Sequence, residues 1–198
     1  MLKFDFSFFK KLSAREKRLT IPTVLTISRM ILVPFIVIAM IVHHWGIAFW
    51  LFLIAVFTDT VDGSLARLSG EKTFLGTCLD PVADKLLILS CFFTLAFVQS
   101  PLFTIPLWFV LLVLIKELIV IGGALIILLL GGRLNICPTW LGKITTVAQI
   151  SFIIWLFACY FFHWLPIKTY HTMLGIVILL TLLSLIQYVR IGFHTIEG

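Results

Sequence analysis

Four aspartates in one stretch of the chain are the residues best suited to do chemistry. Asp59 and Asp62 are three positions apart, and Asp80 and Asp84 are four apart, so each pair lies on one face of a helix. All four fall in or beside strongly apolar segments, where a carboxylate costs at least about 2 kcal/mol. Acidic residues placed there normally face a polar cavity, and we therefore expect these four to have a function.

Small residues and a cation share the helix faces of these aspartates. At about 100° per residue, one face of the first helix spans an arc of about 140° and holds Asp59, Asp62, Gly63, Ala66 and Arg67. The second helix carries an i, i+4, i+8 stripe made of Gly76, Asp80 and Asp84. Because only a short polar segment separates the two helices, the two stripes can face each other across a helical hairpin.

Converging carboxylates repel one another unless protons or cations neutralise them, and hard divalent cations are the usual solution. No cysteine or histidine accompanies the aspartates, so the donor set favours Mg²⁺ or Mn²⁺ over zinc. Two ions about 3.5–4 Å apart would suit four carboxylates and a phosphorylated substrate. Arg67 adds a cation suited to phosphate. A competing interpretation is a set of ion pairs that joins helices through Arg67, Lys85 and Lys116, but such pairs need no small residues beside the acids.

The composition predicts an all-α integral membrane protein. Of 198 residues, 61% are hydrophobic and 12% are charged, against about 25% charged in ordinary soluble domains. The apolar runs and the turn signals between them indicate six transmembrane helices in one domain, near 21–42, 46–68, 74–98, 104–130, 139–162 and 169–191. Nothing in the sequence suggests a nucleic-acid partner.

The loop cations predict that both termini and the aspartate-bearing ends of the helices are cytoplasmic. With six spans, one side of the membrane receives only Lys168. The other side receives Lys3, Lys10, Lys11, Arg15, Lys17, Arg18, Arg67, Lys72, Arg133, Lys143 and Arg190.

Residues 1–20 form a separate segment ahead of the membrane domain, which covers residues 21–198. Phe4, Phe8 and Leu12 make an apolar stripe at helical spacing, with basic residues around it. This pattern predicts an amphipathic helix that lies on the anionic cytoplasmic face of the membrane. The alternative is a disordered basic tail.

The aspartate segment resembles the signature of a known enzyme family. The residues Asp59, Asp62, Gly63, Ala66, Arg67, Gly76, Asp80 and Asp84 match all fixed positions of the pattern D-x₂-D-G-x₂-A-R-x₈-G-x₃-D-x₃-D. This pattern is typical of the CDP-alcohol phosphatidyltransferases, and a chance match is on the order of 10⁻¹⁰ per starting point.

The resemblance implies that an alcohol displaces CMP from a CDP-lipid at a membrane-embedded site. It assigns Asp59, Asp62, Asp80 and Asp84 to two divalent cations, Mg²⁺ or Mn²⁺, with Asp84 also acting as the general base. It assigns the CDP moiety to Gly63, Ala66, Arg67 and Gly76. It further implies a homodimer, CDP-diacylglycerol as donor, a phosphorylated alcohol as acceptor, and a bacterial inner (cytoplasmic) membrane.

Two branches of the family compete for the acceptor. The segment from Ile21 to Arg29 and the segment from Leu79 to Lys85 resemble branches that use glycerol 3-phosphate or phosphatidylglycerol. We favour glycerol 3-phosphate, although Lys116-Glu117 replaces the usual Arg-Glu pair and Ala124 occupies the place of a later Arg. The alternative product is cardiolipin.

The acceptor phosphate is expected at Lys116, Arg133 and Lys143, of which Lys116 lies deepest in an apolar run. For Arg133 and Lys143 the alternative is that each is a surface cation whose stem lies along the lipid. In a different class, a divalent-cation transporter would also carry intramembrane acids, but its site is expected at the midplane between repeated halves.

Overall fold

A computed structural model describes residues 21–69, 74–98, 103–129 and 139–197, and side chains within 26–59, 82–98, 103–122 and 139–191. This part of the chain consists of helices joined by short connections and contains no strand. Its helices are α2 (Ile21–Ile41), α3 (Trp45–Ser69), α4 (Phe74–Phe97), α5 (Leu107–Leu129), α6 (Trp140–Phe162) and α7 (Ile167–Glu197). The expected amphipathic segment 1–20 lies outside the described residues and stays a prediction.

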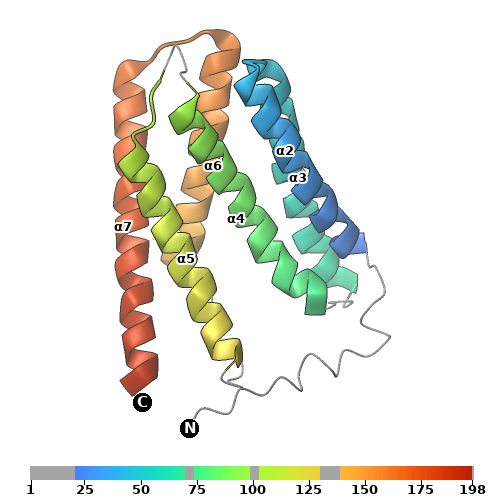
Figure 1. Cartoon of the computed structure of the whole chain (residues 1–198), viewed down its shortest axis with the longest axis vertical. Coiled ribbons are helices and arrows are strands. Elements are labelled where there is room, and N and C mark those ends of the chain that lie inside the picture. Colours follow the sequence, from blue (N-terminus) through green and yellow to red (C-terminus); the bar gives the residue numbers. More distant parts are fainter. Residues whose placement is uncertain (1–20, 70–73, 99–102, 130–138, 198) are drawn as a thin grey trace.

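The helices run alternately up and down in one bundle (Figure 1). The start of α2, the end of α3, the start of α4 and the end of α7 therefore lie at the same end of the bundle, which we call the N/C end. α4 contacts α2, α5 and α6, and α7 packs against α5 and α6. α2 also packs against α3. The sequence signature, which lies in the second half of α3 and the first half of α4, is therefore toward the N/C end.

The opposite end of the bundle is closed by apolar and aromatic packing. Phe103 and Ile105, in the connection before α5, are both buried. The Tyr160 hydroxyl of α6 donates to the Phe103 carbonyl over 3.1 Å, and the Tyr170 hydroxyl of α7 donates to the Thr104 carbonyl over 2.8 Å. Since these bonds satisfy carbonyls of an irregular segment, they hold that connection against the bundle.

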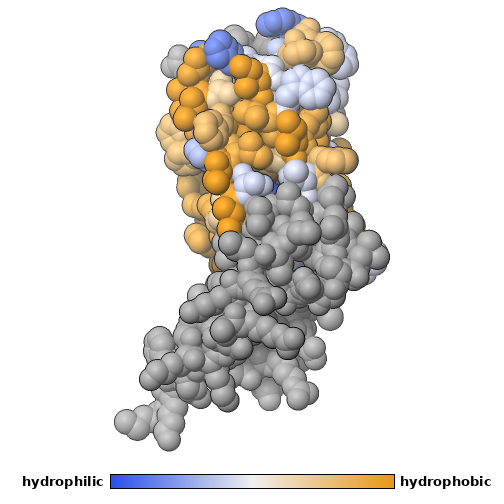
Figure 2. Space-filling view, turned by 90° about the vertical axis from the view of Figure 1, so that its right-hand side faces the viewer, coloured by the Kyte–Doolittle hydropathy of each residue, from blue (hydrophilic) through white to orange (hydrophobic). Residues whose placement is uncertain are grey.

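The outer surface of the bundle is strongly apolar. Large side chains such as Phe57, Val147 and Phe162 keep more than three-fifths of their area exposed. Figure 2 shows apolar residues over the middle of one face and hydrophilic residues gathered at its upper edge. Among the described residues, 140–162 and 167–191 are long and apolar enough to cross a membrane. These observations fit a membrane protein.

Candidate active site

The sequence signature is divided between two adjacent helices at the N/C end. Asp59 and Asp62 lie in the second half of α3, with Gly63, Ala66 and Arg67 after them. Gly76, Asp80 and Asp84 lie in the first half of α4. Of these eight, Asp59 and Asp84 have described side chains, and the side chains of the other six lie outside the described residues.

Asp59 is held by a cation from α2. Its Oδ1 lies 2.6 Å from Nη1 of Arg29. The Arg29 side chain is fully buried, whereas 41% of the Asp59 side chain is exposed. The carboxylate is therefore oriented from the protein side and remains accessible from the solvent side, as a ligand for a solvent-borne ion must be.

Asp84 lies half-buried on α4, among charges from three other helices. Its carboxylate is close enough to Asp59, Arg29, Lys85 and Glu117 for their charges to act on it. The first and the last aspartate of the signature therefore lie within electrostatic range of each other. Both of their helices pack against α2, and a direct facing of the two aspartate stripes stays a prediction.

The described donors fit a hard divalent cation. Asp59 and Asp84 offer carboxylate oxygens from two helices, and such oxygens are the ligands that Mg²⁺ and Mn²⁺ prefer. Within the described ranges no group of three or more acidic, cysteine or histidine side chains forms a complete metal site. Two of the four expected ligands, Asp62 and Asp80, are among the side chains that are not described, so the full ligand set stays a prediction.

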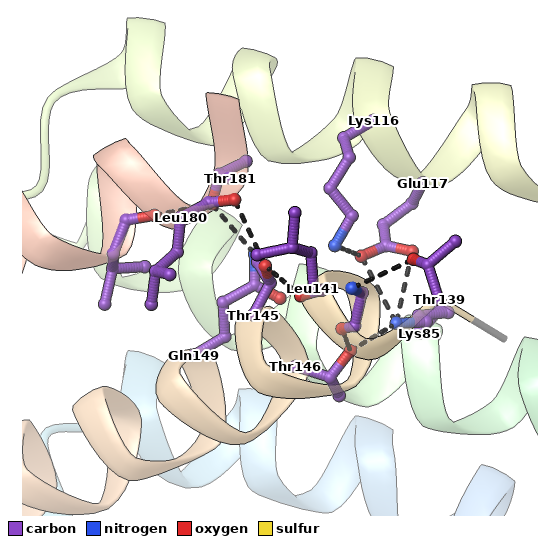
Figure 3. Close-up of polar contacts among 12 residues, drawn as sticks. Lys85, Lys116, Glu117, Thr139, Leu141, Thr145, Thr146, Gln149, Leu180 and Thr181 are labelled. Carbon is purple, nitrogen blue, oxygen red and sulfur yellow. Dashed lines mark hydrogen bonds and ion pairs between the residues drawn. The ribbon is translucent and has the colours of Figure 1, made fainter. Parts of the chain in front are cut away.

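A second polar cluster lies between α4, α5 and α6 (Figure 3). It includes Lys85, the residue that follows Asp84 in α4. The Glu117 Oε1 atom is 2.7 Å from Nζ of Lys116, and Glu117 Oε2 is 3.3 Å from Nζ of Lys85. Lys85 also donates to Oγ1 of Thr146 over 3.0 Å. Lys116 and Glu117 are almost completely buried. We call these four residues the Glu117 cluster.

The ion pairs in the structure can be compared with those that the competing interpretation of the sequence expects. It pairs Lys85 and Lys116 with the signature aspartates, whereas the ion pairs formed by both lysines are with Glu117. Asp59 does form an ion pair with a cation of another helix, Arg29 of α2, so the structure contains one pair of the kind that this alternative proposes. The lysines therefore have an acid of their own.

The other two residues that were expected to bind the acceptor phosphate are Lys143 and Arg133. Lys143 lies in the first turn of α6, where its side chain is exposed and its Nζ is 5.7 Å from the centre of the Trp140 ring. This contact is a cation–π interaction at the helix end. Arg133 lies outside the described residues. The structure thus joins Lys116, but not Lys143, to the cluster beside Asp84.

Three residues gain importance that the sequence did not give them. The sequence marks Arg29 and Lys85 as ends of segments that resemble the family, Lys85 also as a partner in the ion-pair alternative, and Glu117 as the neighbour of Lys116. Each is a charged residue within an apolar run, which is the same signal that singled out the aspartates. Their partners are distant in sequence, so spacing alone could not reveal the contacts.

Comparison with known proteins gives the family. Residues 19–195 match the family described as CDP-alcohol phosphatidyltransferase. A protein of Shigella flexneri serotype 5b named CDP-diacylglycerol--glycerol-3-phosphate 3-phosphatidyltransferase is 33% identical over 177 residues, which cover 85% of this chain and 92% of that protein. Proteins of the same name from Salmonella choleraesuis and Escherichia coli K12 are each 34% identical over 140 residues, covering 69% of this chain and 75% of theirs.

This chain belongs to the CDP-alcohol phosphatidyltransferase family. It is a transferase of phospholipid biosynthesis, and its apolar helices agree with the membrane location of such an enzyme. The alternative of a divalent-cation transporter is thereby set aside.

Proposed function

We propose that this enzyme transfers the phosphatidyl group of CDP-diacylglycerol to sn-glycerol 3-phosphate, giving phosphatidylglycerophosphate and CMP. The observation that carries the proposal is the complete signature on the consecutive helices α3 and α4, whose two described aspartates, Asp59 and Asp84, lie within electrostatic range of each other. The names of the relatives support glycerol 3-phosphate over phosphatidylglycerol as the acceptor.

In the proposed reaction, a hydroxyl oxygen of the acceptor forms a bond to the phosphorus that carries the diacylglycerol. The bond from that phosphorus to the bridging oxygen breaks, and CMP leaves with this oxygen. The acceptor's proton goes to the Asp84 carboxylate, which acts as the general base. No covalent enzyme intermediate is needed.

We propose Asp59, Asp62, Asp80 and Asp84 as ligands of two divalent cations, Mg²⁺ or Mn²⁺. When bound, the cations neutralise the pyrophosphate and make CMP a better leaving group. Arg29 orients Asp59 from the protein side over 2.6 Å, so this ligand is pre-organised.

Gly63, Ala66, Arg67 and Gly76 are proposed to hold the CDP moiety, with the small residues leaving room beside the acids. For the acceptor phosphate we propose Lys116, with Arg133 and Lys143 as further candidates.

We further propose that all six helices cross a bacterial inner membrane, with both termini and the active site on the cytoplasmic side. The shared N/C end of the helices and the distribution of loop cations support this orientation. Residues 1–20 are proposed to lie on that membrane face. Family precedent supports a homodimer.

The test is incubation of the purified full-length protein with CDP-diacylglycerol and Mg²⁺, with either sn-glycerol 3-phosphate or phosphatidylglycerol added. CMP release is measured and the lipid product is identified by mass. We expect CMP and phosphatidylglycerophosphate with glycerol 3-phosphate. Cardiolipin as the product of the second mixture, with no CMP from the first, would assign the enzyme to the other acceptor.

A further inference from the structure

The Glu117 cluster places two cations around one acid in the interior of the bundle. The side chains of Lys116 and Glu117 are each 2% exposed, and that of Lys85 is 16% exposed. Three helices contribute, since Lys85 comes from α4, Lys116 and Glu117 from α5, and Thr146 from α6 (Figure 3). Two ammonium groups and one carboxylate leave one positive charge in excess.

Such a cluster is a poor way to stabilise a bundle. Charged groups lose hydration when they are buried, and apolar side chains of similar size often stabilise a protein as well or better. The excess charge has no counterion within the cluster itself. The other acid within electrostatic range of both lysines is Asp84, which the proposed reaction uses as a metal ligand and general base. The arrangement therefore indicates a binding site for an anion rather than a structural contact.

One ammonium group also has donors to spare. Within the described part of the chain, the ion-pair partner of Lys116 Nζ is the Glu117 carboxylate, at 2.7 Å. An ammonium group carries three N–H donors. A phosphate oxygen arriving at Lys116 would accept such a bond and would supply the missing negative charge.

The cluster is next to the proposed general base. Lys85 follows Asp84 directly in α4, and the charges of Lys85 and Glu117 act on Asp84. Lys116 is also within electrostatic range of Asp84. In sn-glycerol 3-phosphate, the terminal hydroxyl and the phosphate are at opposite ends of a three-carbon chain. An acceptor with its hydroxyl at Asp84 can thus direct its phosphate toward the two lysines.

We infer that Glu117 is a positioning residue, whose carboxylate holds the Lys85 and Lys116 ammonium groups beside Asp84 so that both bind the phosphate of the acceptor. This inference rests on the proposed function. Without the Glu117 carboxylate, the two ammonium groups repel each other. Asp84 is then the acid that remains for both lysines to pair with. Glu117 therefore fixes the lysines and keeps the general base from being neutralised by them.

The test compares Glu117→Gln with the wild-type full-length enzyme. We expect the KM for sn-glycerol 3-phosphate to rise by about tenfold or more, with the KM for CDP-diacylglycerol changing by less than about twofold. The inhibition constant of inorganic phosphate against glycerol 3-phosphate should rise in parallel, because that anion reports on the phosphate site alone. Glu117→Asp keeps the charge and should recover part of the affinity.

The matched control is Gln149→Leu, which removes another fully buried polar side chain and its contact of 3.5 Å to Thr181 of α7. This variant should leave both KM values near those of the wild type. Equal rises of both KM values in Glu117→Gln, or no rise for glycerol 3-phosphate, would overturn the positioning role.

Should Glu117→Gln fail to fold, Glu117→Asp and Thr146→Val give the same comparison, since each disturbs the Lys85 position without leaving a lysine charge unpaired. We expect a several-fold rise in the KM for glycerol 3-phosphate in both, and unchanged values would reject the inference. Failure of the proposed function is a separate result, because the wild-type enzyme would then release no CMP with glycerol 3-phosphate.

Discussion

The fully buried guanidinium of Arg29 lies 2.6 Å from the half-exposed carboxylate of Asp59 and so ties α2 to the first aspartate of the family signature. Removing one partner of an ion pair with a buried cation leaves an uncompensated charge, which is costly, so the pair restrains both side chains. Asp59 can therefore bind a metal ion in a fixed orientation.

Replacing Arg29 should reduce turnover by misplacing Asp59. We expect Arg29→Met to lower kcat by about tenfold or more, and Arg29→Lys to lose less because it keeps a charge but not the planar fork. CMP release at saturating substrates measures the effect, and thermal unfolding in detergent measures stability. Turnover of Arg29→Met equal to that of the wild type would contradict the orienting role.

Removal of divalent cations should abolish transfer. If the aspartates bind hard cations, exhaustive chelation stops CMP release, and Mg²⁺ or Mn²⁺ restores it. The control is the same protein carried through the procedure with no chelator. Full turnover after chelation would eliminate the metal site.

The membrane orientation can be tested by cysteine labelling in intact cells. In a background where Cys78, Cys91, Cys137 and Cys159 are replaced, an impermeant thiol reagent should label Lys168→Cys but not Lys72→Cys. The reason is that cationic loops are retained in the cytoplasm, and Lys168 belongs to the other side. Labelling of Lys72→Cys from outside would reverse the proposed topology.

The close approach of α6 and α7 depends on Gly142. A Cβ at this position would lie 2.5 Å from the Tyr188 hydroxyl oxygen and 3.0 Å from Thr139 Oγ1. Gly142→Ala should therefore destabilise the protein by about 1–3 kcal/mol through overpacking. Adding Tyr188→Phe removes the nearest atom and should restore part of the loss in thermal unfolding. An unchanged melting temperature in the single variant would show that the contact relaxes freely.

Much of the fold could be predicted from where the apolar runs begin and end. The predicted helices near 21–42, 46–68 and 139–162 agree with α2, α3 and α6 to within about two residues. The start of α5 was predicted near 104 but lies at Leu107, because Phe103 and Ile105 are apolar yet belong to an irregular connection buried by Tyr160 and Tyr170. At these two residues, hydrophobicity indicates burial and not helix formation.

The end of α7 shows the opposite effect. The prediction ended this helix near residue 191, where the apolar run ends, but the helix continues to Glu197. A helix satisfies its backbone hydrogen bonds internally, so it can continue beyond the apolar segment into a polar environment. Composition therefore defines the expected membrane segment better than the end of the helix.

The candidate site was only partly predictable. The sequence places Glu117 next to Lys116, and in the structure the two side chains form an ion pair. The binding of the acceptor phosphate by Lys116 stays a prediction. The link from Glu117 to Lys85, and from there to Thr146, joins residues on three helices. Such contacts depend on how the helices pack. Helical periodicity predicts which face of a helix is buried, but not which helix packs against that face.

The measurement that tests the account most directly is the turnover of Asp84→Asn at saturating cation, CDP-diacylglycerol and glycerol 3-phosphate. An amide oxygen can still coordinate a cation but cannot take the acceptor's proton at neutral pH. We expect kcat to fall by about 10²–10⁴-fold with part of the cation and CDP-lipid affinity retained, whereas Asp62→Asn should mainly weaken cation binding. Near-normal turnover of Asp84→Asn under these conditions would contradict the role of Asp84 as the general base.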